Sequence, residues 1–223
     1  KGVDLVEAIQ KRIDVMKMEA ITKGKFEYNA NGVKAVVDFG IPAEHKIALT
    51  DGDDWDETDR DIIGDLLEWV ATYEEANGKQ PDAILVSREV FNRMAKNQLI
   101  ITEAGRPAGS LRASLEDVQS VLAANGLPEI TIVTDRKVTV KNPYTGQNET
   151  IEFMPVNRVV FVSEGVGEFL LGVTVENDFR PGIALDAYDK NEPVESVLRA
   201  VAAGFPAVMK PELLLHADVF PGA

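Results

Sequence analysis

The sequence predicts a mixed α+β protein in which a central sheet is covered by helices. Near the start, apolar residues recur every three or four positions, as they do on one face of a helix. In the middle of the chain, short apolar runs typical of buried strands alternate with helical segments. Pairs of strand-like runs joined by turn residues flank this middle part, which is typical of hairpins.

Composition excludes several classes of protein. The 223 residues hold 23 Lys and Arg against 37 Asp and Glu, a formal net charge of −14, so binding to a phosphate backbone is not expected. With 45% hydrophobic and 27% charged residues, the chain is expected to fold as one large or two small domains. Cysteine is absent, which excludes thiolate catalysis and cysteine-ligated metals.

The first segment is predicted to be an amphipathic helix that ends at Gly24. Its apolar stripe follows a spacing of 3, 4, 3 and 4 residues and consists of Val6, Ile9, Ile13, Met16 and Ala20. Asp4 is the one plausible N-cap, because only Lys1 and Gly2 precede Val3. We therefore expect a further segment upstream of Lys1.

A hairpin is predicted next. Strands at 25–30 and 33–39 flank Asn31-Gly32, two residues that tolerate the positive φ angles of a two-residue turn.

Acidic residues are concentrated around Trp55 in the segment 51–61. Thr58 or Asp59 is predicted to cap a helix that runs to about Ala76 and is stopped by Asn77-Gly78.

The middle of the chain is predicted to hold three buried strands, at 83–86, 130–133 and 159–162. Ser87 and Ser114 are each placed to cap a helix, the second of which ends at Asn125-Gly126. The segments 138–140 and 151–153 read as a hairpin with a long loop at 142–146. Two further extended segments, 194–203 and 213–219, are predicted to be split by Pro206 and Pro211.

The acidic segment superficially suggests a calcium loop. An EF-hand loop starting at Asp51 would need an oxygen ligand at position five, Gly at six and Glu at twelve. Those positions hold Trp55, Asp56 and Ile62, so the match fails. A solvated acidic loop with helix caps is favoured over an irregular cation site.

Other chemical signals are equally weak. His45 and His216 lie far apart and are expected to be structural or exposed, because a catalytic zinc site commonly needs more histidines. Gly165-Val166-Gly167 lacks the third glycine of a dinucleotide fingerprint, since that position is Leu170, and is predicted to be a turn between strands. Met16 and Met18 are expected in the core. No catalytic, metal-binding or cofactor-binding residue is predicted.

The order of these features resembles the major capsid proteins of tailed phages, of the lambda protein E type. The resemblance rests on the opening helix leading to Gly24-Lys25, on Val36 to Pro42, on Gly78 to Ser87, on Asn157 to Val162 and on the closing segment from Glu192 to Val219. It covers about residues 1 to 220 and implies the Hong Kong 97-like α+β fold.

The resemblance also implies a division into domains. Residues 1–50 would form a peripheral domain of spine helix and hairpin, with a return strand at 186–207 in the same elongated sheet. Residues 51–185 would form the axial domain, with 208–223 as its final strand and tail. The family's N-terminal arm and extended loop should precede the spine helix and are not seen in this sequence.

The function that the resemblance implies is structural. Copies of the chain would form pentamers and hexamers of an icosahedral phage or prophage head around double-stranded DNA, assembled in the host cytoplasm. Expected partners are other copies of the chain and scaffolding, portal or decoration proteins, with no enzyme activity, cofactor, membrane or sequence-specific nucleic acid. Two alternatives stay open: an encapsulin-like compartment, and an α/β enzyme or cation binder that uses 51–61.

Overall fold

The computed structural model describes residues 2–30, 33–50, 52–141, 147–192 and 194–222. Its helices are α1 (Gly2–Lys23), α2 (Ile62–Asn77), α3 (Arg88–Lys96), α4 (Gln98–Glu103) and α5 (Leu115–Ala124), with short 3-10 turns η1 (Ala43–His45), η2 (Val175–Asn177) and η3 (Pro211–Leu213). Its strands are β1 (Lys25–Ala30), β2 (Val33–Asp38), β3 (Lys46–Ala48), β4 (Ala83–Ser87), β5 (Ile130–Val133), β6 (Lys137–Lys141), β7 (Asn148–Glu152), β8 (Arg158–Val162), β9 (Gly167–Thr174), β10 (Arg180–Pro181), β11 (Ile183–Asn191), β12 (Val194–Val208) and β13 (Leu214–Asp218). The predicted α+β class is confirmed.

A five-stranded mixed sheet organises the core, in the order β3-β13-β8-β4-β5. The pairs β13–β3 and β4–β5 are parallel and the two inner pairs are antiparallel. The three predicted strands of the middle segment and the strand near the end are confirmed as β4, β5, β8 and β13. Strand β3 was not predicted, because three residues are too few to show a period of two.

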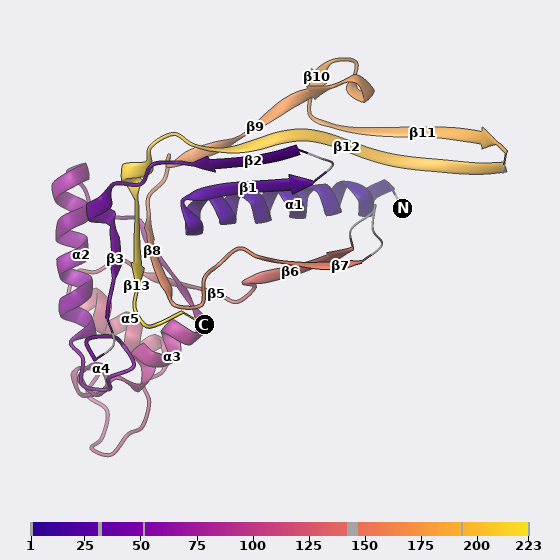
Figure 1. Cartoon of the computed structure of the whole chain (residues 1–223). Coiled ribbons are helices and arrows are strands. Elements are labelled where there is room, and N and C mark those ends of the chain that lie inside the picture. The colour runs from indigo at the N-terminus through magenta and orange to yellow at the C-terminus, as the bar shows by residue number, and fades with distance from the viewer. Residues whose placement is uncertain (1, 31–32, 51, 142–146, 193, 223) are drawn as a thin grey trace.

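Helices pack on this sheet through large apolar side chains. Trp69 of α2 meets the ring of Phe161 of β8 edge-on, with centroids 6.3 Å apart. Val90 and Met94 of α3 are buried, and this helix contacts β4 and β5. The predicted arrangement of a central sheet covered by helices is therefore confirmed (Figure 1).

Local capping signals fix most helix ends. The Ser87 and Ser114 side chains accept backbone hydrogen bonds at the starts of α3 and α5, and Gly78 ends α2 in the left-handed conformation, as predicted. The predicted cap of α2 is wrong, because Asp61 takes that role and accepts from the Gly64 N–H. The carbonyl of Thr58 instead accepts a 2.8 Å hydrogen bond from Gln98 N, which holds residue 58 against the start of α4.

The rest of the chain is built around α1, which the sequence predicted and which Gly24 ends with a φ of +66°. Figure 1 shows α1 between the β6–β7 hairpin on one side and β1, β2 and β12 on the other. Both predicted hairpins are confirmed as antiparallel pairs, whereas their turns at 31–32 and 142–146 lie outside the described residues. The long β11–β12 hairpin projects past the start of α1.

Two expectations about β12 are wrong. The strand is not split at Pro206 but runs through it, with Pro206 opposite Phe169 of β9. Strand β11 pairs only with residues 194–202, so one edge of β12 is open at Pro206, where a proline is tolerated. Strand β12 also does not share a sheet with the β1–β2 hairpin, because its sheet has the order β10-β9-β12-β11. The two meet through side chains, with the Phe26 and Phe205 rings 5.3 Å apart.

Candidate assembly surface

The acidic loop 52–61 is anchored in the core by Trp55. Only 2% of this side chain is exposed, and its ring stacks on Trp69 with centroids 5.8 Å apart. The indole Nε1 donates a 2.9 Å hydrogen bond to Oδ2 of Asp65, and the backbone N–H donates to the carbonyl of Val219. The loop therefore closes one end of the core.

Arginines neutralise several carboxylates around this loop. The Arg60 guanidinium donates to both oxygens of Asp65, at 3.0 and 2.6 Å, and this hydrogen bonding raises the pKa of Arg60. Arg93 donates from Nε to Asp56 at 2.6 Å. Among the described residues no group of three or more histidines and acids could hold a metal ion. This loop thus has a structural explanation that needs no cation.

Loss of the Asp53 carboxylate is expected to have little effect on stability. Asp53 has a side chain that is 78% exposed and lies 3.4 Å from Arg60, so its ion pair contributes at most about 1 kcal/mol. We expect Asp53→Ala to lower the melting temperature by no more than about 4 °C. Millimolar calcium or magnesium should stabilise neither protein in differential scanning fluorimetry. A clear stabilisation of the parent chain that Asp53→Ala abolishes would instead support the cation-binding alternative.

Both histidines are buried and bind backbone carbonyls. Nδ1 of His45 donates to the carbonyl of Leu214 at 2.9 Å, and its ring stacks on Tyr73 with centroids 5.9 Å apart. Nε2 of His216 donates to the carbonyl of Ile21 at 2.7 Å. Burial lowers the pKa of His216 to about 4, and the charge of Arg158 adds to this effect. Of the two expectations for these residues, structural or exposed, the structure agrees with the first, since both are buried.

The glycine pair and the methionines also have structural roles. Gly165 has a φ of +78° in the turn that joins β8 to β9, so the predicted turn between strands is confirmed. A dinucleotide site would need a helix after this turn. Met16 is buried on α1, and Met18 packs partly buried against the core, as expected. No described helix is both long and apolar enough to cross a bilayer.

Apolar surface is concentrated on the four-stranded sheet and the segments attached to it. Of the fifteen exposed large apolar side chains among the described residues, ten lie between positions 170 and 209. They are Leu170, Leu171, Val173, Val175, Phe179, Leu185, Tyr188, Val194, Leu198 and Met209. Such a concentration of exposed apolar side chains marks an interaction surface more often than a free one.

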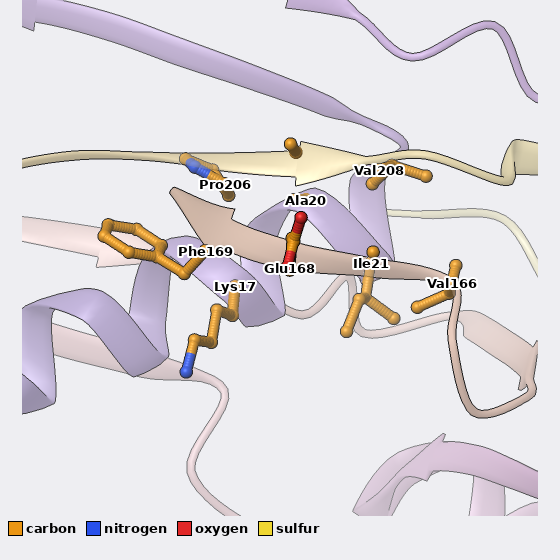
Figure 2. A pocket seen from close by; sticks show the side chains of 10 residues that line it. Lys17, Ala20, Ile21, Val166, Glu168, Phe169, Pro206 and Val208 are labelled. Atoms are coloured by element: carbon orange, nitrogen blue, oxygen red, sulfur yellow. The ribbon is translucent and has the colours of Figure 1, made fainter. Parts of the chain in front are cut away.

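Hollows flank α1 on both sides. Toward the four-stranded sheet, pockets of about 330 and 500 Å³ share Phe169 and follow one another along the helix. The smaller one is lined by side chains from α1, β9 and β12, among them Lys17 and Ile21, and by Val166 just before β9 (Figure 2). Toward the β6–β7 hairpin, a third pocket of about 450 Å³ lies against Lys11 and Asp14.

This surface was not predicted from the sequence. Strands β9 and β11 were left without assignment, although 169–175 is an almost continuous apolar run and 183–188 is apolar except for Asp186. Those two patterns are the signals that could have found the strands. Which side chains stay exposed depends on the pairing of β9 and β11 with β12, which the local sequence does not reveal.

Residues 2–194 match the profile of a family described as phage major capsid protein E. The chain belongs to this family. The resemblance seen in the sequence is thereby confirmed over most of the chain. Among curated proteins, no sequence is significantly similar to this member of the capsid protein E family.

Solved structures share the fold of this capsid protein E family member. A protein described as a prophage capsid protein from Escherichia coli CFT073 is 15% identical, with a TM-score of 0.71 over 97% of this chain and 65% of that one. A phage-related protein from Bordetella bronchiseptica is 14% identical, with a TM-score of 0.62 and the same two coverages. The capsid of the myovirus XM1 is 14% identical, with a TM-score of 0.51 over 95% of this chain and 61% of that one.

The predicted Hong Kong 97-like phage capsid fold is therefore confirmed. The chain spans slightly less than two thirds of the length of the first two of these structures.

Proposed function

We propose that this chain is the major capsid protein of a tailed phage or prophage head. Copies form pentamers and hexamers that close into an icosahedral shell around double-stranded DNA, and the protein resides in the virion after assembly in the host cytoplasm. The observation that carries this proposal is the match to the phage major capsid protein E family over residues 2–194, together with the capsid fold. The same match favours a phage head over an encapsulin-like compartment.

The distribution of exposed surface supports the proposal. A shell subunit must bury extended faces against several neighbours, and its heterologous contacts generate rings. This chain carries its exposed apolar side chains mainly on the four-stranded sheet and the segments attached to it, and it projects the β11–β12 hairpin away from the body (Figure 1). A two-stranded hairpin is marginally stable by itself in water, so contact with a neighbour would stabilise it.

The subunit is proposed to have no enzyme activity and no cofactor, since the acidic loop and both histidines have structural roles. Beyond its own copies, the proposed partners are scaffolding, portal or decoration proteins. The domain division stays as predicted, with 1–50 and 186–207 peripheral and 51–185 and 208–223 axial. Two strand pairs cross these boundaries. Strand β3, within 1–50, pairs with β13, and β9, within 51–185, pairs with β12.

Negative-stain electron microscopy of the complete gene product tests this function. We expect closed particles of uniform diameter that sediment far faster than a subunit. Particles formed in an infected or induced host should protect double-stranded DNA from nuclease. Particles filled with one enzyme and no DNA would support the compartment alternative, and the lack of any particle would contradict both shell functions.

A further inference from the structure

The loop that follows β9 exposes an aromatic side chain in an unfavourable backbone conformation. Asp178 and Phe179 have φ angles of +52° and +59°, in the left-handed region that bulky residues avoid. The Phe179 side chain is 69% exposed, as is that of Val175 at the start of η2. Residues 175–179 therefore form a protruding loop, called the knob below, whose two large apolar side chains are exposed to water.

The hollow between α1 and the four-stranded sheet has complementary properties. Its smaller pocket is lined mainly by apolar side chains, including Ile21, Val166 and Phe169. Two charged side chains also line it: Lys17, which is 45% exposed and lies 3.8 Å from Asp14, and Glu168. In the adjoining pocket, Nη1 of Arg12 is buried and has no hydrogen-bond partner among the described residues. A buried guanidinium nitrogen without a partner is costly, so an occupant that brings a carboxylate would be favoured.

The knob offers that combination of groups. Phe179 and Val175 supply apolar side chains, and Asp178 places a carboxylate directly beside the aromatic ring. We propose that the knob of one copy docks into the hollow beside α1 of a second copy. Phe179 then fills the apolar pocket, and Asp178 lies close to the positive charges of Arg12 and Lys17.

The knob cannot fill the smaller pocket of its own chain. That pocket is lined by residue 166 and by 167–169 at the start of β9, whereas the knob begins directly after this strand ends. The six steps of chain from 169 to 175, at about 3.3 Å each, separate the two by roughly 20 Å. A knob and a hollow on different surfaces of the same subunit give a head-to-tail contact, which forms a ring when the rotation between copies closes. The inference rests on the proposed shell function and names one contact within it.

Cysteine cross-linking tests the contact directly, because the chain has no cysteine of its own. The complete gene product carrying Lys17→Cys and Asp178→Cys is assembled and treated with a short bismaleimide. We expect a ladder of dimers, trimers and larger species on a denaturing gel. A link within one chain leaves the product at monomer size, so the ladder reports only links between copies. The matched control pairs Lys17→Cys with Leu111→Cys, which is 81% exposed on a distant loop and should give only background.

The outcomes separate the inference from the function on which it rests. Closed particles with no ladder beyond the control would overturn the knob contact and leave the shell function standing. Dimers as abundant with Asp178→Cys alone as with the cysteine pair would mean that knobs meet knobs, and would also overturn it. If no particles form from the parent protein, the shell function itself fails.

A second variant tests the knob without a cross-linker. Phe179→Asn removes the aromatic ring and places a residue that tolerates the left-handed region at this position. We expect an unchanged or higher subunit melting temperature but at least a tenfold loss of particles by sedimentation. Leu111→Asn is the control and should assemble normally. Normal assembly of Phe179→Asn would contradict the proposal.

Discussion

Replacing Trp55 by alanine is expected to lower the free energy of unfolding by about 3–5 kcal/mol, the range for truncating a buried tryptophan. The substitution removes the stack on Trp69 and leaves Asp65 without the indole hydrogen bond. It also opens a cavity where the acidic loop closes the core. Urea denaturation followed by circular dichroism measures the change.

The control for this prediction is Leu111→Ala. Leu111 is also a large apolar residue in a loop, but it is 81% exposed, so its truncation should change the free energy by less than about 0.5 kcal/mol. If Trp55→Ala costs as little as this control, the loop is not part of the core. The cation-binding alternative for residues 51–61 would then regain support.

Acidification from pH 6.5 to about 4 is expected to destabilise the fold through His216. Its pKa is 6.5 in the unfolded chain and about 4 in the fold, so between these values the unfolded chain binds the extra proton. The stabilisation is fully present above pH 6.5 and falls as the pH decreases through this window, by about 3 kcal/mol in total. The groups around the imidazole are Arg158 and Lys46, which disfavour its protonation, and Asp218, which favours it.

The variant His216→Gln isolates this effect, because a glutamine amide can still donate to the carbonyl of Ile21. Free energies of unfolding measured at several pH values should fall less steeply between pH 6.5 and 4 for the variant than for the parent. Carboxylates that titrate in the same range affect both proteins equally and cancel in the comparison. Equal slopes would show that His216 is not held neutral by the fold.

The elements predicted correctly are those whose signals are local. Ser87, Ser114 and Gly78 act within one turn of the chain, and the apolar runs of β4, β5 and β8 are complete in themselves. The cap of α2 was misplaced because Thr58, Asp59 and Asp61 are all good caps. In the fold Asp61 accepts from the Gly64 N–H, while the carbonyl of Thr58 accepts a hydrogen bond from the distant Gln98.

Strand partners were not predictable in the same way. The family resemblance implied one elongated sheet for the β1–β2 hairpin and β12, yet β12 pairs with β9 and β11, whose pairing depends on residues far apart in sequence. Pro206 was expected to lie outside a strand, because proline has no N–H to donate to a neighbouring strand. It is tolerated in β12 because one edge of the strand has no partner at this position.

The assembly surface is the least readable part of the sequence. An active site leaves a motif, because chemistry needs certain residue types at certain spacings. A contact surface needs only shape and exposed apolar area, which arise when the sheet forms. The function was therefore indicated by the resemblance of the whole chain to phage capsid proteins and not by any single catalytic or binding motif. The knob at 175–179 could not be predicted from sequence, because it is defined by the φ angle and the exposure of Phe179 in the fold.

An electron cryomicroscopy reconstruction of particles from the complete gene product would show whether this chain forms the wall of a phage head. We expect icosahedral shells in which this fold accounts for the density of five-membered and six-membered rings. Homogeneous small oligomers under all assembly conditions, or shells whose wall is built by a different protein, would contradict it.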